Sequence, residues 1–394
     1  MSTTIPLPDA DALAHSQHLA TLIRAEIANN GGSVPFSRFM ERCLYAPGLG
    51  YYSAGSAKFG AEGDFVTAPE LGPLFAVCVA ESLAPVLGQL GPDAEFVEIG
   101  GGSGAFAETA LKRLLQLDAM PARYRILEPS ADLRARQRDR LGRSLTPPVF
   151  ERVEWLEQPP QAPWRGVVFA NEVIDALPTP RFSLAKGDVM EEHVALDGAG
   201  NFVRTDRPAD AMLAAAVRHV ERYLDRPFAD GYRSELLPQL PYWLQAVIGP
   251  LGAGALLFVD YGYPRSEFYL PERAQGTLRA FYRHRLHEDP YLWPGLQDLT
   301  ASVDFTALAE AGTVAGFELA GYCAQAAFLL GNGLADRVSE AQSQGDAQRA
   351  LKFANEAKKL TLPTGMGERF QVMGFQRDVE FGAAFLGGDL TWRL

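Results

Sequence analysis

A cluster of glycines behind an acidic residue is the stretch of this sequence best suited to chemistry. The apolar segment 95–99 leads into Gly100, Gly102 and Gly104, and an alanine- and leucine-rich segment with helical spacing follows from Ala105. A strand, a tight glycine turn and a helix in this order predict the nucleotide-binding corner of an α/β fold. The glycines allow a sharp turn, and the start of the helix directs unpaired N–H groups at a ligand.

The same residues fit the patterns of two cofactors. From Gly100 to Ala105 they match G-x-G-x-x-A, which suits a dinucleotide, and from Glu98 to Gly104 they match acid-x-G-x-G-x-G, which suits S-adenosylmethionine. Glu98 favours S-adenosylmethionine, because a carboxylate has no favourable interaction with a phosphate. It can interact with the cationic amino end of the methionine moiety through water or backbone groups. A nicotinamide dinucleotide and a glycine turn without a ligand remain as alternatives.

A second carboxylate, Glu128, follows the predicted strand at 124–127. Adjacent parallel strands end side by side, so we expect Glu128 to accept hydrogen bonds from the ribose hydroxyls of a nucleoside. A further strand is predicted at 148–153, and Trp155 just after it is a candidate neighbour of the adenine, with simple packing as the more frequent role of a tryptophan.

Two more candidate cofactor residues, Asp64 and Thr67, lie in the loop-like segment 63–70 before a predicted helix at 74–87. Loops of this kind can close over a bound cofactor. A turn followed by a helix N-cap explains the same residues equally well.

An amide and two carboxylates follow the continuously apolar segment 167–170, which is typical of a buried parallel strand. They are Asn171, Glu172 and Asp175. In open α/β sheets, ligands bind at the carboxyl ends of the strands, so these side chains are the candidate catalytic residues. Together they could hold a cationic amine or guanidinium by charge-assisted hydrogen bonds. Capping of a following helix is the alternative role for Asp175.

The net charge, the cysteine spacing and the absence of targeting signals limit the classes of partner, metal site and location that we expect. A net charge of −12 over 394 residues argues against nucleic acid as a partner and is compatible with a cationic substrate. Cys43, Cys78 and Cys323 show no metal-binding or disulfide spacing, and we expect no metal site at His284 and His287. No export signal, presequence or membrane span is recognised, so we expect a cytoplasmic protein.

The chain length and the order of the predicted elements suggest one large α/β domain with additions. Segments 191–196 and 202–205 predict a β-hairpin, whereas 265–303 reads as a long loop of the kind that forms lids. We expect residues 1–90 to be an N-terminal helical and loop segment contributing to a cofactor lid. Residues 91–180 and 250–394 would form the core, and 181–249 an insertion on the substrate side.

The sequence resembles the MidA family of S-adenosylmethionine-dependent methyltransferases over some three hundred residues. The shared stretches, in order, are Phe39-Met40 to Leu44-Tyr45, Pro47, Gly50-Tyr51-Tyr52, Gly63-Asp64-Phe65, Thr67-Ala68-Pro69-Glu70, Glu98 to Gly104, Asn171-Glu172, Asp175-Ala176-Leu177-Pro178, Asp260-Tyr261-Gly262, Gly295, Asp298 to Ala301, Val303-Asp304-Phe305 and Met366-Gly367-Glu368. The resemblance implies a Rossmann-like, seven-stranded methyltransferase core with an added lobe. It also implies protein arginine N-methylation of a respiratory complex I subunit, because mitochondrial members of the family are complex I assembly factors.

Two departures from the family pattern stand out. Ser302 occupies a position where histidine is common, which leaves a proton-handling role of that loop open, and Gly101 and Ser103 replace a proline and a larger polar residue. A small-molecule methyltransferase and a non-catalytic assembly factor that binds S-adenosylmethionine are the alternative functions. The methyl acceptor, the degree of methylation and the oligomeric state, for which a homodimer is one option, are left open.

Overall fold

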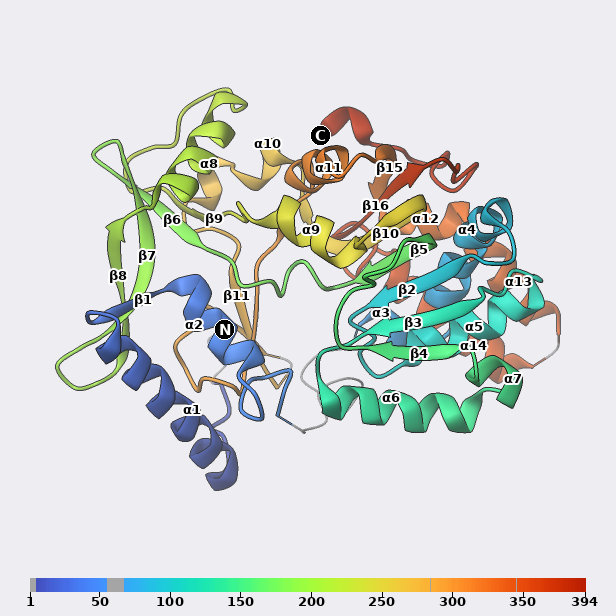
Figure 1. Ribbon diagram of the computed structural model, residues 1–394, viewed down its shortest axis with the longest axis horizontal. Helices are drawn as coiled ribbons and strands as arrows, with labels where there is room; N and C mark the ends of the chain where they lie inside the picture. Colours follow the sequence, from blue (N-terminus) through green and yellow to red (C-terminus); the bar gives the residue numbers. More distant parts are fainter. Residues whose placement is uncertain (1–4, 55–66, 284, 345) are drawn as a thin grey trace. The chain divides into compact units, whose positions relative to one another are not determined.

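The computed structural model describes residues 5–54, 67–283, 285–344 and 346–394 (Figure 1). The chain divides into a first unit of Met1–Phe65, Ile174–Gln239 and Tyr263–Asp304 and a second unit of Val66–Val173, Leu240–Gly262 and Phe305–Leu394. This division differs from the expected boundaries in several places, of which two are large. The second unit includes the helix that begins at Leu74, and the first unit includes the segment from Tyr263 to Asp304.

A mostly parallel sheet forms the centre of the second unit. Its strands are β2 (Glu95–Ile99), β3 (Arg123–Leu127), β4 (Val153–Leu156), β5 (Trp164–Asn171), β10 (Leu251–Tyr263), β15 (Glu318–Ala324) and β16 (Phe370–Arg377), in the order β15-β16-β10-β5-β2-β3-β4. The pairs from β10 to β4 are parallel, and β16 pairs antiparallel with β10 and β15. The Rossmann-like α/β class is therefore confirmed. The exact strand number depends on whether the two-residue strand β14 (Val303–Asp304) is counted, so it stays a prediction.

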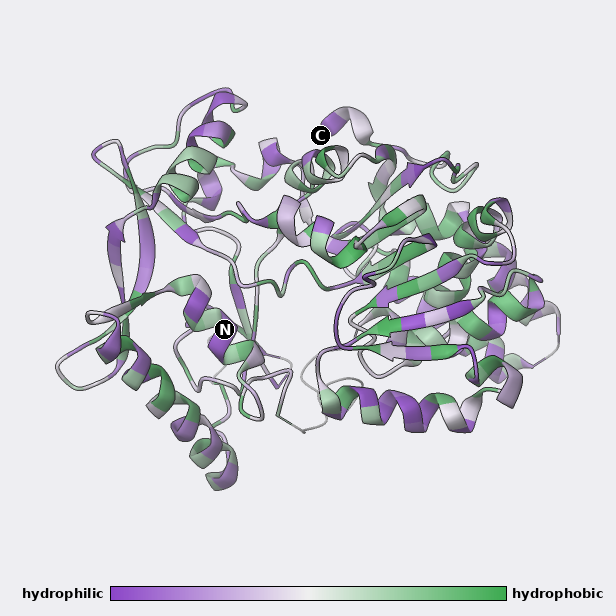
Figure 2. Cartoon of the chain, in the orientation of Figure 1, coloured by the Kyte–Doolittle hydropathy of each residue, from purple (hydrophilic) through white to green (hydrophobic). Residues whose placement is uncertain are grey.

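The helices of the second unit follow the strands, as expected for a doubly wound fold. They are α3 (Ala68–Leu71), α4 (Leu74–Leu90), α5 (Ala105–Gln116), α6 (Ala131–Ser144), α7 (Pro147–Phe150), α9 (Leu240–Ile248), α11 (Phe305–Val314), α12 (Gln325–Gly331), α13 (Leu334–Ser343), α14 (Ala347–Thr361) and the 3₁₀ helix η2 (Thr391–Arg393). Figure 2 shows hydrophobic residues dominating β5 and β10, whereas α6 is mostly hydrophilic.

Burial explains why the strands leading to the glycine cluster are so apolar. All five residues of β2 are buried, and Phe106 of α5 stacks on Phe169 of β5 with ring centroids 4.1 Å apart. Strands covered on both faces cannot alternate between apolar and polar residues. The sheet is therefore a rigid base from which the loops at its carboxyl edge project.

The first unit contains two smaller sheets and the helices packed on them. Its strands are β1 (Ser33–Pro35), β6 (Arg181–Ala185), β7 (Asp188–Leu196), β8 (Phe202–Pro208) and β9 (Arg233–Glu235) in one sheet, and β11 (Arg279–Tyr282), β12 (Arg285–His287) and β13 (Asp298–Thr300) in the other. Its helices are α1 (Ala10–Asn29), α2 (Phe36–Tyr45), α8 (Ala211–Arg222), α10 (Arg265–Phe268) and η1 (Pro271–Arg273). The β7–β8 pair confirms the predicted hairpin.

Two of the predicted local structures are wrong. Residues 148–152 form no strand: Pro147 and Pro148 begin the short helix α7, and β4 begins at Val153, the last residue of the predicted strand. Proline fits the first turn of a helix because its N–H is not needed there, whereas it cannot donate in a sheet. The segment 265–303 is not a long loop, because it contains the sheet of β11, β12 and β13. Strands of three or four residues are too short to reveal an alternating pattern.

Candidate functional site

The glycine loop after β2 has the conformation that its sequence predicts. Gly100, Gly102 and Gly104 have φ values of 68°, 51° and 82°, in the left-handed region that glycine enters without steric cost. The Gly100 N–H donates to the carbonyl of Leu127 over 3.0 Å, so the loop begins beside the end of β3. Gly104 is the N-cap of α5. The loop therefore presents its backbone at the carboxyl edge of the sheet.

Glu98 lies inside the unit rather than in solvent. Its side chain is 3% exposed, and its Oε2 accepts a hydrogen bond of 2.8 Å from the hydroxyl of Tyr124. Burial raises the pKa of Glu98 to about 7, and the nearby charge of Glu128 acts in the same direction, while the bond from Tyr124 opposes them. An acid in this environment can change its protonation state when a charged ligand binds.

Glu128 stands directly after β3, beside the glycine loop, and is 5% exposed. Its Oε1 accepts from the backbone N–H of Ser130 over 3.0 Å, whereas its Oε2 lies 3.5 Å from Nε2 of Gln137, at the outer limit of a hydrogen bond. Burial raises the pKa of Glu128 to about 7. Because a carboxylate oxygen accepts more than one bond, Oε2 retains capacity for a hydroxyl of a ribose. The donor and acceptor set thus fits a nucleoside.

Trp155 lies on β4 and is packed on three sides. Its indole N–H donates to Oε1 of Gln137 over 2.9 Å, the guanidinium of Arg138 lies 4.8 Å from the ring centroid, and the ring of Phe150 is tilted against it with centroids 6.1 Å apart. Contact with an adenine stays a prediction. Gln137 was not predicted as a site residue, although it connects Trp155 to Glu128.

The segment before α4 contacts the glycine loop through a residue that was not among the predicted ligands. The hydroxyl of Ser103 donates to the carboxylate of Glu70 on α3, and the same hydroxyl accepts from Nη1 of Arg140 over 2.9 Å. Thr67 is the N-cap residue of α3, although its side chain makes no capping hydrogen bond. Asp64 lies outside the described residues.

Asn171 and Glu172 emerge at the carboxyl end of β5, as predicted. The Asn171 amide donates to Oε1 of Glu172 over 3.1 Å, and Oδ1 of Asn171 is buried without a hydrogen bond from any residue that the structure describes. Glu172 has a φ of 54°, an unusual left-handed conformation for a residue with a side chain. Asp175 belongs to the first unit, is 5% exposed, and its carbonyl accepts from the N–H of Ala301 over 2.9 Å.

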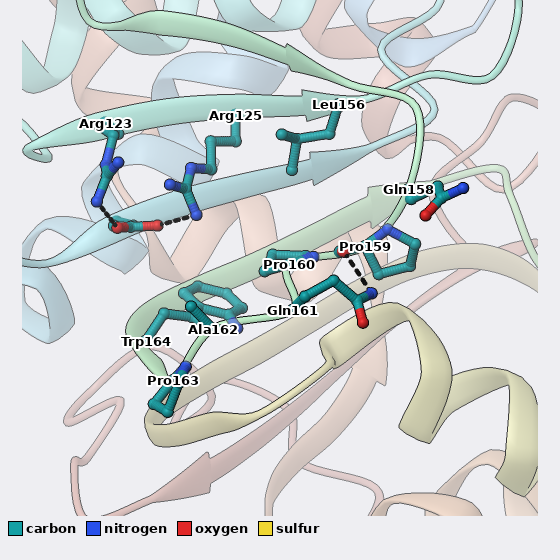
Figure 3. A pocket seen from close by; sticks show the side chains of 11 residues that line it. Arg123, Arg125, Leu156, Gln158, Pro159, Pro160, Gln161, Ala162, Pro163 and Trp164 are labelled. Atoms are coloured by element: carbon teal, nitrogen blue, oxygen red, sulfur yellow. Dashed lines mark hydrogen bonds and ion pairs between the residues drawn. The ribbon is translucent and has the colours of Figure 1, made fainter.

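A pocket of about 260 Å³ opens at the other edge of the same sheet, where β2, β3 and β5 begin (Figure 3). Its charged lining is an ion-paired group in which Glu95 contacts Arg123 at 2.9 Å and Arg125 at 2.6 Å. The segment 158–163 closes its other side. Glu95 begins the strand that Ile99 ends, so this pocket is separate from the glycine loop.

A family of S-adenosyl-L-methionine-dependent methyltransferases has a sequence model that matches residues 78–323. The chain belongs to this family. The match spans β2 to β15 and includes the glycine loop, Glu128 and the Asn171–Glu172 pair. It confirms the resemblance on which the predicted cofactor and reaction class depend.

Relatives and solved structures agree with this assignment. The methyltransferase is 29% identical to the mitochondrial protein arginine methyltransferase NDUFAF7 homolog of Drosophila melanogaster, covering 93% of this chain and 87% of the relative. It is 24% identical to the human NDUFAF7, covering 86% and 79%. A crystal structure from Burkholderia thailandensis bound to S-adenosyl-homocysteine is 44% identical and superposes with a TM-score of 0.92, covering 99% of this chain and 100% of that one.

These comparisons confirm that the protein is an S-adenosylmethionine-dependent methyltransferase with S-adenosylmethionine as its cofactor. The position of the glycine loop fits the methionine moiety of that cofactor, and the free capacity of the Glu128 carboxylate fits its ribose. Across the described ranges, no helix is long and apolar enough to cross a membrane. The same ranges contain no group of three or more histidine, cysteine, aspartate or glutamate residues placed to hold a metal ion.

Proposed function

We propose that this methyltransferase transfers a methyl group to an arginine side chain of a protein. The single observation that carries the proposal is the position of Asn171 and Glu172 at the carboxyl end of β5, where α/β folds place their chemistry. A carboxylate with an adjacent amide suits a planar guanidinium, which has five N–H donors and no acceptor. The names of the relatives, which are protein arginine methyltransferases at 24–29% identity, support the same acceptor.

Each of the three catalytic candidates has a distinct task in this proposal. The cofactor supplies an electrophilic methyl group on a sulfonium. Glu172 orients the guanidinium, so that one nitrogen forms the new N–C bond while the C–S bond breaks. A guanidinium has a pKa above about 12, so it attacks while protonated and releases its proton late, to Glu172 or to water. Asn171 and Asp175 shape the acceptor site, and positioning and charge provide most of the rate enhancement.

On the cofactor side, the proposed ligands are Glu98 for the amino end, the glycine loop for the methionine backbone and Glu128 for the ribose. Asp64, Thr67 and Trp155 complete the set as proposed neighbours of the cofactor. Residues 181–249 would serve as the substrate-side lobe.

The proposed acceptor is a subunit of respiratory complex I, which is the acceptor that the MidA resemblance implies. We propose the cytoplasm as the location of the reaction. A net charge of −12 is compatible with a cationic acceptor segment.

Two other functions predict different results in one experiment. Lysate proteins are incubated with the enzyme and S-adenosylmethionine that carries an isotopically labelled methyl group, and labelled peptides are identified by mass spectrometry. The proposal expects label on arginine of a complex I subunit, and none with Glu172→Gln. Label only on a small molecule would favour a small-molecule methyltransferase. Cofactor binding without any labelled product would favour a non-catalytic assembly factor.

A further inference from the structure

Gln137 is a fully buried polar residue in the middle of the most hydrophilic helix of the second unit. It lies on α6 with Leu133 and Leu141 one turn to either side, and these three residues form the buried stripe of the helix. Its exposed fraction is 0%. Burial of an amide without hydrogen bonds costs several kcal/mol on the order-of-magnitude scale for polar groups, so such a residue must be held by specific partners.

The partners of Gln137 fix the orientation of its amide. The indole nitrogen of Trp155 can only donate, so the atom 2.9 Å from it must be the carbonyl oxygen Oε1. Nε2 therefore faces the opposite side, where it donates to the carbonyl of Gly102 over 2.9 Å and approaches Oε2 of Glu128 at 3.5 Å. In this orientation the amide offers an acceptor to Trp155 and donors to Gly102 and Glu128.

The two groups that receive Nε2 belong to different parts of the cofactor site. Gly102 lies in the glycine loop after β2, and Glu128 follows β3. A single amide group connects them. The contact is tight, because a Cβ atom added at Gly101 would lie 3.1 Å from Nε2 and 2.7 Å from Cγ2 of Ile126. A side chain at position 101 therefore has no room between the loop, Ile126 and Gln137.

We infer that Gln137 is a positioning residue for S-adenosylmethionine, which holds the Gly102 carbonyl and the Glu128 carboxylate at a fixed separation without itself contacting the cofactor. This inference rests on the proposed roles of the glycine loop and Glu128, and not on the identity of the methyl acceptor. The expected consequence is that changes at Gln137 weaken cofactor binding in the folded enzyme.

Two substitutions separate the donor function of the amide from its shape. Gln137→Met keeps the length of the side chain and removes the donor and the acceptor. Gln137→Glu keeps the acceptor for Trp155, but at high pH it places a negative charge beside the Gly102 carbonyl and Glu128. When the introduced carboxyl group is protonated, it has one O–H donor and one carbonyl acceptor, so it replaces the acceptor and one of the two N–H donors of the amide.

The chain offers a matched control in Gln325 on α12. This residue is also 0% exposed, lies in the same unit, and donates from Nε2 to the carbonyl of Leu360 over 3.1 Å. Gln325→Met and Gln325→Glu should lower the melting temperature as the corresponding Gln137 variants do. They should leave the affinity of the folded protein for S-adenosylhomocysteine unchanged.

The experiment measures S-adenosylhomocysteine binding by calorimetry, with each variant compared with the wild type at the same pH. We expect Gln137→Met to weaken binding about tenfold or more at every pH, the effect of losing a donor to a carboxylate. Gln137→Glu should weaken it by at least as much at pH about 8.5, and this loss should shrink at pH about 6. Comparison at one pH is needed because Glu128 and Glu98 titrate nearby, and Arg134, Arg138 and Arg140 of α6 add positive charge.

Wild-type affinity in both Gln137 variants would overturn the inference. So would an equal loss in the Gln325 variants, because Gln137 would then act only through stability. Neither result tests the proposal that arginine is the methyl acceptor, because the calorimetry contains only the enzyme and S-adenosylhomocysteine. Conversely, a failure to find labelled arginine in the lysate experiment leaves the role of Gln137 in cofactor binding intact.

Discussion

The hydroxyl of Tyr124 donates a hydrogen bond of 2.8 Å to the carboxylate of Glu98, and both side chains are almost completely removed from solvent. Burial raises the pKa of Glu98 from 4.5 to about 7. An acid whose pKa is higher in the folded than in the unfolded state binds more protons when folded, over the interval between the two values. The contribution of Glu98 to the stability of the cofactor-free protein should therefore fall as the pH rises from about 4.5 to about 7.

Glu98→Gln should remove this loss, because the amide oxygen still accepts from Tyr124 and cannot ionise. At pH about 8 we expect the free energy of unfolding to increase by up to about 3 kcal/mol, from a shift of about 2.5 pKa units. At pH about 4 the gain should vanish. Urea unfolding without cofactor provides the measurement, and Glu157→Gln, at an exposed surface ion pair, is the control. A gain that is independent of pH would contradict burial of the charge.

S-adenosylmethionine and S-adenosylhomocysteine should raise the melting temperature, whereas NAD should not. A ligand that binds only the folded state stabilises it by mass action. In the proposed assignment, Glu98, the glycine loop and Glu128 would bind an adenosyl amino acid rather than a pyrophosphate. A thermal-shift assay tests this directly, and stabilisation by NAD without any response to S-adenosylhomocysteine would refute the assignment of these residues.

Glu128→Ala should weaken S-adenosylhomocysteine binding by roughly 1 to 3 kcal/mol, the usual contribution of a hydrogen bond to a charged group. The fold should survive, because Glu128 lies at the end of β3, and the polar contacts described for its side chain, with Ser130 and Gln137, are ones that the substitution removes without changing its backbone bonds. Calorimetry gives the affinity and circular dichroism gives the fold. An unchanged affinity would show that Glu128 does not contact the ribose.

Glu172→Gln should slow methyl transfer by about a hundredfold or more and leave S-adenosylhomocysteine binding nearly unchanged. The substitution keeps the shape of the side chain and removes the charge that orients a guanidinium and stabilises the transition state. Single-turnover transfer to the acceptor identified by labelling is the measurement. If activity and cofactor affinity fall together, Glu172 has a structural role, and if neither falls, Asp175 is the next carboxylate to test.

Much of the cofactor side was predictable from sequence because it follows from local rules. The spacing of the glycines predicts the loop, in which Gly100, Gly102 and Gly104 have positive φ. The end of the next predicted strand gives the position of Glu128. Gln137 was missed, although a signal exists. A glutamine between Leu133 and Leu141 at spacings of four, in an otherwise charged helix, predicts a buried amide. Only the fold tells which groups that amide contacts.

Two features of the rest of the chain could not be predicted from local patterns in the sequence. The strands β11, β12 and β13 have three or four residues each, too few to show an alternating pattern, and β13 pairs with β11 across a long separation, with Thr300 opposite Arg279. The contact between Ser103 and Glu70 likewise joins segments 33 residues apart. Neither feature leaves a periodic trace in the sequence.

The left-handed backbone at Glu172 makes a glutamate at this position unfavourable for the stability of the fold. Residues with a Cβ atom adopt a φ near 54° at a cost of about 1 kcal/mol or more, and glycine or asparagine occupy it more easily. A laboratory evolution experiment that selects for heat resistance alone should therefore tend to replace Glu172 with one of those two residues. Thermostable variants obtained in this way would lose the carboxylate, so engineering of this enzyme must hold position 172 fixed.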